Sequence, residues 1–547
     1  PSDFPLLSLS QANLDALHAQ RDFHTLYRLT PLQEGLLFHA LHAPSSDQYT
    51  VQVEMTTSPD VNLVHLKDAW DRIVMQHSIL RTSFAWSGLD CPVQLVHPSC
   101  DLQWSVSSYS QKAERRLLAY LIAKDRKSGF CFDSPSGLHR VQIVQFIDTT
   151  IILFTFHHII LDGWSVSNLV NQLIENYSAR CSSNSIEPRN SLSSNDFQAY
   201  VNYLYRQPLA PLKDFWEAYL SGLTAANTDV FLPTLSGINS EFDLVEHSVT
   251  FTDISVSSLA NFCRAWGCSS ASLLQFAWGY CCSRYHCSKD ITFGTTVSGR
   301  DAALDGVENM VGLLVSTVPV RIKLERGSIR DQVINHHKAM QDISRFSTSS
   351  LSDLQRLAQL PALFSHLFLV ENYPLGQRDA SSIEISSLVF HEKTNYPLTV
   401  WCSTSECISL LVSYDAKSFS RQYISKLSTL FKRVLLCILS GTSESLLVDI
   451  PLSVIGEDYD LISRFTRGPS RDGSNQNLCT LFASCAQSHL DLPAVEWQGS
   501  SISYSDLLSR VQKVSALLTS KGATRSSTIG VLLRRGIDLV ASLIGTL

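Results

Sequence analysis

Residues 156–165 read FHHIILDGWS and mark the junction between a buried strand and a helix. The run IILFTF at residues 151–156 is almost entirely apolar, which predicts a central strand. From residue 166 to residue 177 the apolar residues recur with helical spacing, which predicts an amphipathic helix. Ser165 is expected to be the N-cap of this helix, because serine is one of the residues preferred at that position.

His157 and His158 are the candidate functional residues of this junction. Adjacent strand residues point to opposite faces, so one imidazole is expected to enter a cavity and the other to face the interior. An imidazole titrates near neutral pH and suits proton transfer or hydrogen bonding to a reacting amine. Asp162 is expected to fix the loop through an ion pair, and Gly163, which has no Cβ, permits close approach. The alternative interpretation is a pair of core histidines beside a turn.

The sequence on both sides of this junction mixes strand and helix patterns. Alternating residues at 141–147 and a turn at 148–150 predict a hairpin with the central strand. Further strands are predicted at residues 50–56, 290–297, 313–322, 367–370 and 407–414, and helices at residues 63–75, 272–285 and 418–439. Because strands and helices do not follow a strict β-α-β order, the predicted fold is two α/β sandwich lobes rather than a doubly wound sheet.

The composition is that of a globular protein. A length of 547 residues corresponds to roughly three to four folding units. Hydrophobic residues make up 44% and charged residues 17%, which excludes disorder, collagen and coiled coil as the main character. The net charge of -7 and the lack of a basic run give no electrostatic footprint for nucleic acid.

The sequence also gives expectations about compartment and metal binding. No apolar stretch reaches the about 18 residues that a membrane span needs. Residues 1–20 lack the basic start and long apolar stretch of a signal peptide, so a cytoplasmic protein without membrane contact is expected. The 14 cysteines include no CxxC pair and no cluster with histidine, which favours buried reduced thiols over a metal site or a disulfide scaffold.

Several motifs in chain order resemble the condensation domain of nonribosomal peptide synthetases, whose signature is HHxxxDG. They are LTPLQEGLLFH at residues 29–39, HSILRTSF at 77–84, HHIILDG at 157–163, NDFQAY at 195–200 followed by Phe215-Trp216, FGTTVSGR at 293–300, MVGLLVSTVPVR at 310–321, ENYP at 371–374 and TNYPL at 394–398. The resemblance covers nearly all of residues 23–455. It implies an α/β fold of two chloramphenicol-acetyltransferase-like sandwich lobes in a V arrangement.

Two departures from the family pattern concern the acceptor side. Ser316 stands where the family often has Asn, and STSSLSD at residues 347–353 replaces a usual His-Gln-Asp segment. Residues 477–547 resemble the start of an adenylation domain, and no Gly-rich phosphate loop ahead of a Lys is found.

These resemblances imply five segments. They are a linker from a preceding domain at residues 1–22, an N-terminal lobe at 23–180, a C-terminal lobe at 181–455, a second linker at 456–476 and a truncated adenylation domain at 477–547. The chain is therefore expected to be a piece of a multidomain synthetase that is monomeric as a fragment.

The resemblance implies an acyltransferase that forms an amide bond. A donor acyl or peptidyl thioester and an acceptor aminoacyl thioester arrive on phosphopantetheine arms of upstream and downstream peptidyl carrier proteins, and no cofactor is bound tightly. His158 is expected at the reaction centre, either as a general base or as a group that positions the amine. His157 and Asp162 are expected to be structural, with Arg300 as the ion partner of Asp162. Gly163 keeps the donor channel open, and Trp164 is expected to pack rather than to touch substrate.

Three alternatives remain open from the sequence. An epimerization domain shares both lobes and the signature, but it usually has Val-Ser-Trp after Asp-Gly, whereas Trp164-Ser165 follow here. A stand-alone acyltransferase that uses coenzyme A is not expected to be fused to an adenylation domain. A catalytically silent recruitment scaffold is expected to have lost the two histidines. The motifs resemble somewhat more the domains that accept a D-configured donor, and an L-configured donor stays open.

Overall fold

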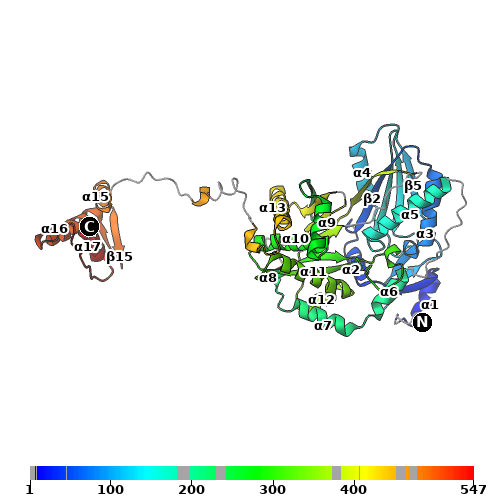
Figure 1. Ribbon diagram of the computed structural model, residues 1–547, viewed down its shortest axis with the longest axis horizontal. Helices are drawn as coiled ribbons and strands as arrows, with labels where there is room; N and C mark the ends of the chain where they lie inside the picture. The colour runs from blue at the N-terminus through cyan, green and yellow to red at the C-terminus, as the bar shows by residue number, and fades with distance from the viewer. Residues whose placement is uncertain are drawn as a thin grey trace. The chain divides into compact units, whose positions relative to one another are not determined.

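The computed structural model describes residues 7, 9–44, 46–181, 197–228, 242–371, 383–405, 407–450, 463–466 and 477–547. The chain divides into two compact units, Pro1–Leu452 and Ser453–Leu547. The larger unit contains two α/β lobes, as the sequence predicts (Figure 1). Within the described residues, no helix is both long and apolar enough to cross a membrane.

The sheet of the first lobe has the strand order β12-β2-β7-β6-β5. Its strands are β2 (Thr50–Thr57), β5 (Gln103–Ser108), β6 (His139–Gln145), β7 (Thr150–His157) and β12 (Ile385–His391). All eight residues of β7 are buried, and β7 pairs antiparallel with both β2 and β6, which confirms the predicted hairpin and central strand. Thr50 lies opposite His157 in the register, so the end of β7 lies beside the start of β2.

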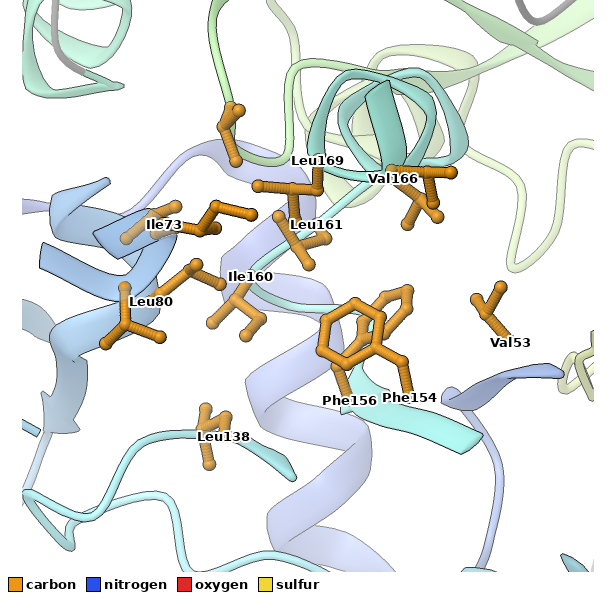
Figure 2. Close-up of a cluster of buried hydrophobic side chains, with 14 of the residues drawn as sticks. Val53, Ile73, Leu80, Leu138, Phe154, Phe156, Ile160, Leu161, Val166 and Leu169 are labelled. Carbon is orange, nitrogen blue, oxygen red and sulfur yellow. The ribbon is translucent and has the colours of Figure 1, made fainter. Parts of the chain in front are cut away.

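Helices cover both faces of this sheet. Helices α3 (Leu63–Gln76) and α5 (Gly163–Cys181) pack on one face, and α4 (Arg115–Arg126) packs on the other (Figure 1). Figure 2 shows Phe154 and Phe156 of β7 in the core beside Leu161, Val166 and Leu169, which precede or belong to α5. One hydrophobic core therefore fixes β7, α5 and the loop of residues 158–162 between them.

A smaller three-stranded sheet, of order β1-β4-β3, completes the first lobe. Its elements and neighbours are β1 (Thr25–Arg28), β3 (Thr82–Ala85), β4 (Val93–Val96), α1 (Gln11–Gln20), α2 (Pro31–His42) and the 3-10 turn η1 (Ser78–Arg81). Residues 1–22 were expected to be a linker, but Leu14 and Leu17 of α1 are buried against this sheet. Helix α1 therefore packs as part of the lobe, because its two leucines cover the apolar side of the small sheet.

The sheet of the second lobe has the strand order β10-β9-β11-β13-β14-β8. Its strands are β8 (Leu244–Phe251), β9 (Asp290–Val297), β10 (Ser316–Lys323), β11 (Leu367–Glu371), β13 (Leu398–Ser403) and β14 (Ile408–Asp415). The helices of the second half are α7 (Leu209–Leu220), α8 (Ala225–Thr228), α9 (Val256–Trp266), α10 (Ser270–His286), α11 (Ile329–Arg345), α12 (Leu351–Ala358) and α13 (Arg421–Ser440), with 3-10 turns η2 (Val307–Asn309) and η3 (Leu447–Asp449). One core holds α9, α10 and α13 against the sheet, and a separate core holds α7 and α12.

The chain crosses between the lobes more than once. Strand β12 follows β11 in the sequence but pairs with β2 in the sheet of the first lobe. Helix α6 (Phe197–Arg206) and residues 310–314 are also buried in the core of the first lobe. For this reason the strand expected at residues 313–322 begins only at Ser316, since Leu313 and Leu314 belong to that core. The boundary expected at residue 180 therefore does not separate the two lobes, because later segments of the chain pack into the core of the first lobe.

The smaller unit contains α15 (Leu478–Ser488), a hairpin of β15 (Pro493–Trp497) and β16 (Ser500–Ser503), α16 (Tyr504–Ser520) and α17 (Ile537–Thr546). Residues 178–195, whose Ser, Asn and Arg content predicts an exposed connection, fall largely outside the described residues, as does the second linker expected at residues 456–476. Residues 178–181 form the last turn of α5, and residues 463–466 are helical.

We expect Leu17→Ala to lower the free energy of unfolding of the larger unit by about 2 kcal/mol or more, because it removes a buried side chain from the α1 contact. Thermal unfolding of this variant and of Gln20→Ala, an exposed position on the same helix, measures the difference. Equal stability of the two variants would contradict the packing of α1 on the lobe.

Candidate active site

A cavity lined by residues of both lobes lies beside His158. The first lobe and its junction contribute Val51, Phe156, His158, Leu161, Asp162 and Gly163, and the second half of the sequence contributes Glu246, Glu371, Phe390, Glu392, Trp401 and Leu411. The cavity lining therefore combines apolar side chains with four carboxylates, of which Glu392 lies 3.5 Å from His158. Sequence reasoning selected His158, Asp162 and Gly163 but none of the glutamates.

His157 and His158 face different surroundings, as the alternation of a strand predicts. The backbone N–H of His157 donates to Leu138 O at 3.0 Å, and that of His158 donates to Tyr49 O at 2.8 Å. His157 is buried, its ring contacts the Phe132 ring at 4.7 Å, and its Nδ1 accepts from the Ile159 N–H at 3.2 Å. Burial, together with the charge of His158, lowers the pKa of His157 to about 3. His157 is therefore neutral at physiological pH and a weak proton acceptor.

His158 is the histidine that faces the cavity. Its side chain is 19% exposed, and its Nε2 lies 3.5 Å from Glu392 Oε1. Its Nδ1 is buried and has no hydrogen-bond partner among the described residues. Of the two ring nitrogens, Nε2 is thus the one that faces a charged group across the cavity.

Asp162, not Ser165, is the N-cap of α5. The Asp162 Oδ1 accepts from the Ser165 N–H at 2.8 Å, and the Asp162 carbonyl accepts from the Val166 N–H at 3.0 Å. The predicted N-cap at Ser165 is wrong by three residues. The Asp162 carboxylate already accepts a hydrogen bond from a free N–H group of the first helical turn. Gly163 therefore becomes the first helical residue and lines the cavity.

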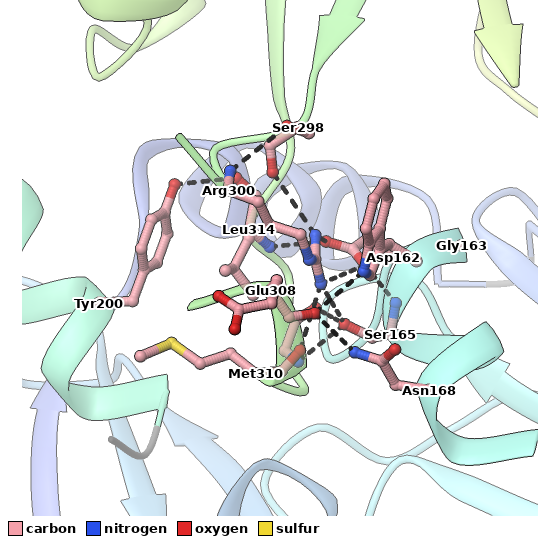
Figure 3. A network of polar contacts seen from close by, with 12 residues as sticks. Asp162, Gly163, Ser165, Asn168, Tyr200, Ser298, Arg300, Glu308, Met310 and Leu314 are labelled. Atoms are coloured by element: carbon pink, nitrogen blue, oxygen red, sulfur yellow. Dashed lines mark hydrogen bonds and ion pairs between the residues drawn. The ribbon is translucent and has the colours of Figure 1, made fainter. Parts of the chain in front are cut away.

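The loop of residues 158–162, here called the signature loop, connects β7 to α5. The buried ion pair of Asp162 with Arg300 links this loop to the second half of the chain (Figure 3). Arg300 Nη1 lies 3.0 Å from Asp162 Oδ2, and Nη2 lies 3.2 Å from Oδ1, which is a two-pronged geometry. The side chains are 5% and 1% exposed. This is the ion pair that the sequence predicts. Asp162 Oδ2 also accepts from the Leu314 N–H at 2.9 Å, so the carboxylate is fully partnered.

The Ser165 hydroxyl joins the same network instead of capping the helix. It donates to Gly312 O at 2.7 Å and accepts from the Gly312 N–H at 3.0 Å and from Arg300 Nη2 at 3.0 Å. A Cβ on Gly312 would lie 2.2 Å from the Phe197 ring, so only glycine fits between Ser165 and α6. The backbone of residues 310–314 is thus held against the signature loop.

Trp164 packs against the second half of the chain. Its Nε1 donates to Glu308 O at 3.0 Å, and the Arg300 guanidinium lies 5.4 Å from the centre of its ring. Asn168 Nδ2 donates to the same carbonyl at 3.0 Å (Figure 3). Trp164 is not among the residues that line the cavity, which is consistent with the packing role expected from the sequence.

A second set of contacts fixes the loop that precedes β2, and the sequence reasoning missed it. Tyr49 has a φ of 61°, an uncommon value for a residue other than glycine. Its N–H donates to Lys393 O at 3.0 Å, and its hydroxyl donates to Asn395 Oδ1 at 2.7 Å. Lys393 also pairs with Asp47 at 2.7 Å. The TNYPL motif at residues 394–398, which contains Asn395, is the sequence signal for these contacts.

The site has no grouping that suggests a metal. In the part of the chain that the structure describes, no three His, Cys, Asp or Glu side chains come together as ligands for an ion. The polar side chains that line the cavity are the imidazole of His158 and the carboxylates of Asp162, Glu246, Glu371 and Glu392.

Acid is expected to destabilise the larger unit through His157. Its folded pKa of about 3 lies below the unfolded value of about 6.5, so the unfolded chain binds more protons between these values and stability falls as the pH falls. In His157→Asn, the amide oxygen replaces Nδ1 as acceptor, and we expect a shallower decline of unfolding free energy between pH 6.5 and 4.5, measured by urea unfolding. A decline as steep as that of the parent would contradict this assignment.

Removing one partner of the Asp162–Arg300 pair leaves a buried charge without compensation. We expect Asp162→Asn and Arg300→Gln each to cost about 3–5 kcal/mol of unfolding free energy. The double variant is expected to cost clearly less than the sum of the two, because it leaves no lone charge. Calorimetry on all four proteins measures the coupling, and strictly additive costs would show that the two side chains do not act as a pair.

Comparison with known proteins gives a consistent result along the whole chain. Residues 24–448 match the family described as "Condensation domain", and residues 481–547 match "AMP-binding enzyme". A linear gramicidin synthase protein of Brevibacillus parabrevis is 29% identical over 570 residues, which covers 100% of this chain and 11% of that protein. Tyrocidine synthase 2 of the same organism is 25% identical over 550 residues, which covers 97% of this chain and 15% of that protein. The chain therefore spans only a fraction of the length of these relatives.

The fold is similar to that of solved condensation domains. The first condensation domain of the calcium-dependent antibiotic synthetase, in complex with a substrate analogue, has a TM-score of 0.66 at 15% identity and covers 79% of this chain and 100% of that one. A four-domain nonribosomal peptide synthetase bound to AMP and glycine has a TM-score of 0.66 at 15% identity and covers 97% of this chain and 42% of that one. With the family match over residues 24–448, the chain belongs to the condensation-domain family of nonribosomal peptide synthetases, and the start of an AMP-binding domain follows it.

Proposed function

We propose that this chain catalyses amide bond formation between a carrier-bound donor thioester and the amine of a carrier-bound acceptor aminoacyl thioester. The observation that carries the proposal is the position of His158, whose Nε2 faces a cavity between the two lobes. A site lined by both lobes suits two substrates that are each tethered to a separate partner.

The reaction needs an amine nitrogen, a thioester carbonyl and a proton acceptor in one place. The amine attacks the donor carbonyl carbon, a C–N bond forms, and the carbonyl oxygen becomes negative. His158 accepts a proton from the amine nitrogen. The negative oxygen then re-forms the carbonyl as the C–S bond breaks, and the donor thiolate takes up the proton from His158. Holding both thioesters in register supplies up to about 7–11 kcal/mol of the barrier reduction, and proton transfer adds a factor of about 10²–10⁴.

The other signature residues support this chemistry indirectly. His157 is neutral and buried, so we assign it to the packing below His158. Asp162 and Arg300 hold the loop that connects His158 to α5, and Trp164 packs on Glu308. Gly163 lines the cavity without a side chain and leaves that wall open to the donor.

The partners follow from the reaction. Upstream and downstream peptidyl carrier proteins deliver the two thioesters on phosphopantetheine arms, which enter as parts of the substrates. The AMP-binding segment at residues 481–547 supports an adenylation domain directly after the condensation domain in the same synthetase.

The test is a single-turnover assay with donor and acceptor carriers loaded with aminoacyl thioesters. We expect His158→Ala to form the dipeptidyl thioester about 10²–10⁴-fold more slowly than the parent, because it removes the proton acceptor at the cavity. His42→Ala, at an exposed position of α2, is the matched control and is expected to keep the parental rate. A His158→Ala variant as fast as the parent would refute the site assignment.

The same assay separates the alternatives. With a single loaded carrier in deuterated buffer, an epimerization domain exchanges the Cα proton, whereas the proposed reaction leaves it in place. A recruitment scaffold gives neither exchange nor dipeptidyl thioester. Either result would overturn the proposal of amide bond formation.

A further inference from the structure

Glu392 is the acidic side chain that faces the reactive nitrogen of His158. Its Oε1 lies 3.5 Å from His158 Nε2, which exceeds the usual range of an N–H···O hydrogen bond. Both side chains are about one-fifth exposed, at 19% for His158 and 22% for Glu392, and both line the same cavity. A nitrogen atom in the cavity can therefore lie within hydrogen-bond distance of both groups at once.

Glu392 is held in place from both sides. On its N-terminal side, His391 ends β12, lies opposite Gln52 of β2 and pairs with Glu54 at 3.0 Å. On its C-terminal side, the Lys393 carbonyl accepts from the Tyr49 N–H, and the Lys393 side chain pairs with Asp47. The carbonyl of Tyr49 in turn accepts from the His158 N–H, so the backbones that carry Glu392 and His158 are joined through one residue.

The charges around Glu392 leave its carboxylate available. Among the described residues, His158 is the only basic group that forms an ion pair with Glu392. Arg126 interacts electrostatically with Glu392 and also with Asp47, Glu246 and Asp125, and it forms no ion pair with Glu392. Its Nε donates to Gln52 at 2.9 Å and its Nη2 to His391 O at 2.7 Å. Glu246 and Glu371 line the same cavity and add negative rather than positive charge.

We infer that Glu392 is a second functional residue of this site, whose carboxylate accepts a hydrogen bond from the attacking amine and stabilises the positive charge formed there. The inference rests on the proposed function. When the C–N bond forms, the amine nitrogen becomes positive and the carbonyl oxygen negative. The proton then moves from this nitrogen to His158 Nε2, and the imidazolium carries the positive charge until the thiolate leaving group is protonated. Glu392 faces both positions that the positive charge occupies, so it lowers the free energy of each state.

The decisive variant is Glu392→Gln, which keeps the shape of the side chain and removes its charge. We expect kcat/KM for the acceptor thioester to fall about 10²-fold, in line with the loss of one preorganised electrostatic contact. KM for the donor thioester is expected to stay within a factor of about two. Glu392→Asp keeps the charge and is expected to lie between the parent and Glu392→Gln.

Glu54→Gln is the matched control, because it removes the ion pair with His391 and loosens the same strand without touching the cavity. We expect it to lower kcat/KM far less than Glu392→Gln does, because the Tyr49 N–H still holds the backbone beside Glu392. A parental rate for Glu392→Gln, or an equal loss in Glu54→Gln, would overturn the role of Glu392. If the parent itself forms no dipeptidyl thioester, the proposed function fails instead, so the two failures are distinguishable. Should Glu392→Gln not fold, Glu392→Asp and Glu54→Gln decide the question, since a purely structural role gives both variants the same rate.

Discussion

The buried ion pair between Asp162 and Arg300 is the interaction on which the arrangement of this site depends. One carboxylate caps α5, accepts from the backbone of Leu314 and pairs with a guanidinium that comes from another part of the sequence. A buried charge pair gains little over a packed apolar contact in net stability. The ion pair instead orients the loop relative to the residues around Arg300, because its two parallel hydrogen bonds restrict how the two segments can lie.

Much of the first lobe could be predicted from local sequence. Strand β7 and helix α5 follow from apolar patterns that a short window contains, and the pairing of Asp162 with Arg300 follows from the family motifs that contain them. The cap at Ser165 was predicted wrongly because two residues three positions apart both have side chains that can cap a helix. Choosing between them needs the position of Gly312, which is distant in the sequence and whose carbonyl accepts from the serine hydroxyl.

The remainder of the site depends on contacts between distant segments. Nothing in the sequence around residues 385–391 indicates that β12 joins the sheet of the first lobe, since its register is set by β2, more than three hundred residues earlier. Glu392 could not be selected from sequence for the same reason. Only the structure shows that Glu392 faces His158, because the fold brings the end of β12 beside Tyr49 and His158.

The path of β12 also bears on how such a chain can be recombined. A strand donated from one half of the sequence to the sheet of the other half makes the two halves topologically inseparable, although each has its own core. A chimera that joins the front half of one synthetase to the rear half of another would import a foreign edge strand, and with it a foreign residue 392 opposite a native imidazole. An exchange of the whole larger unit keeps this pairing intact, because β2, β12 and residue 392 then come from the same parent.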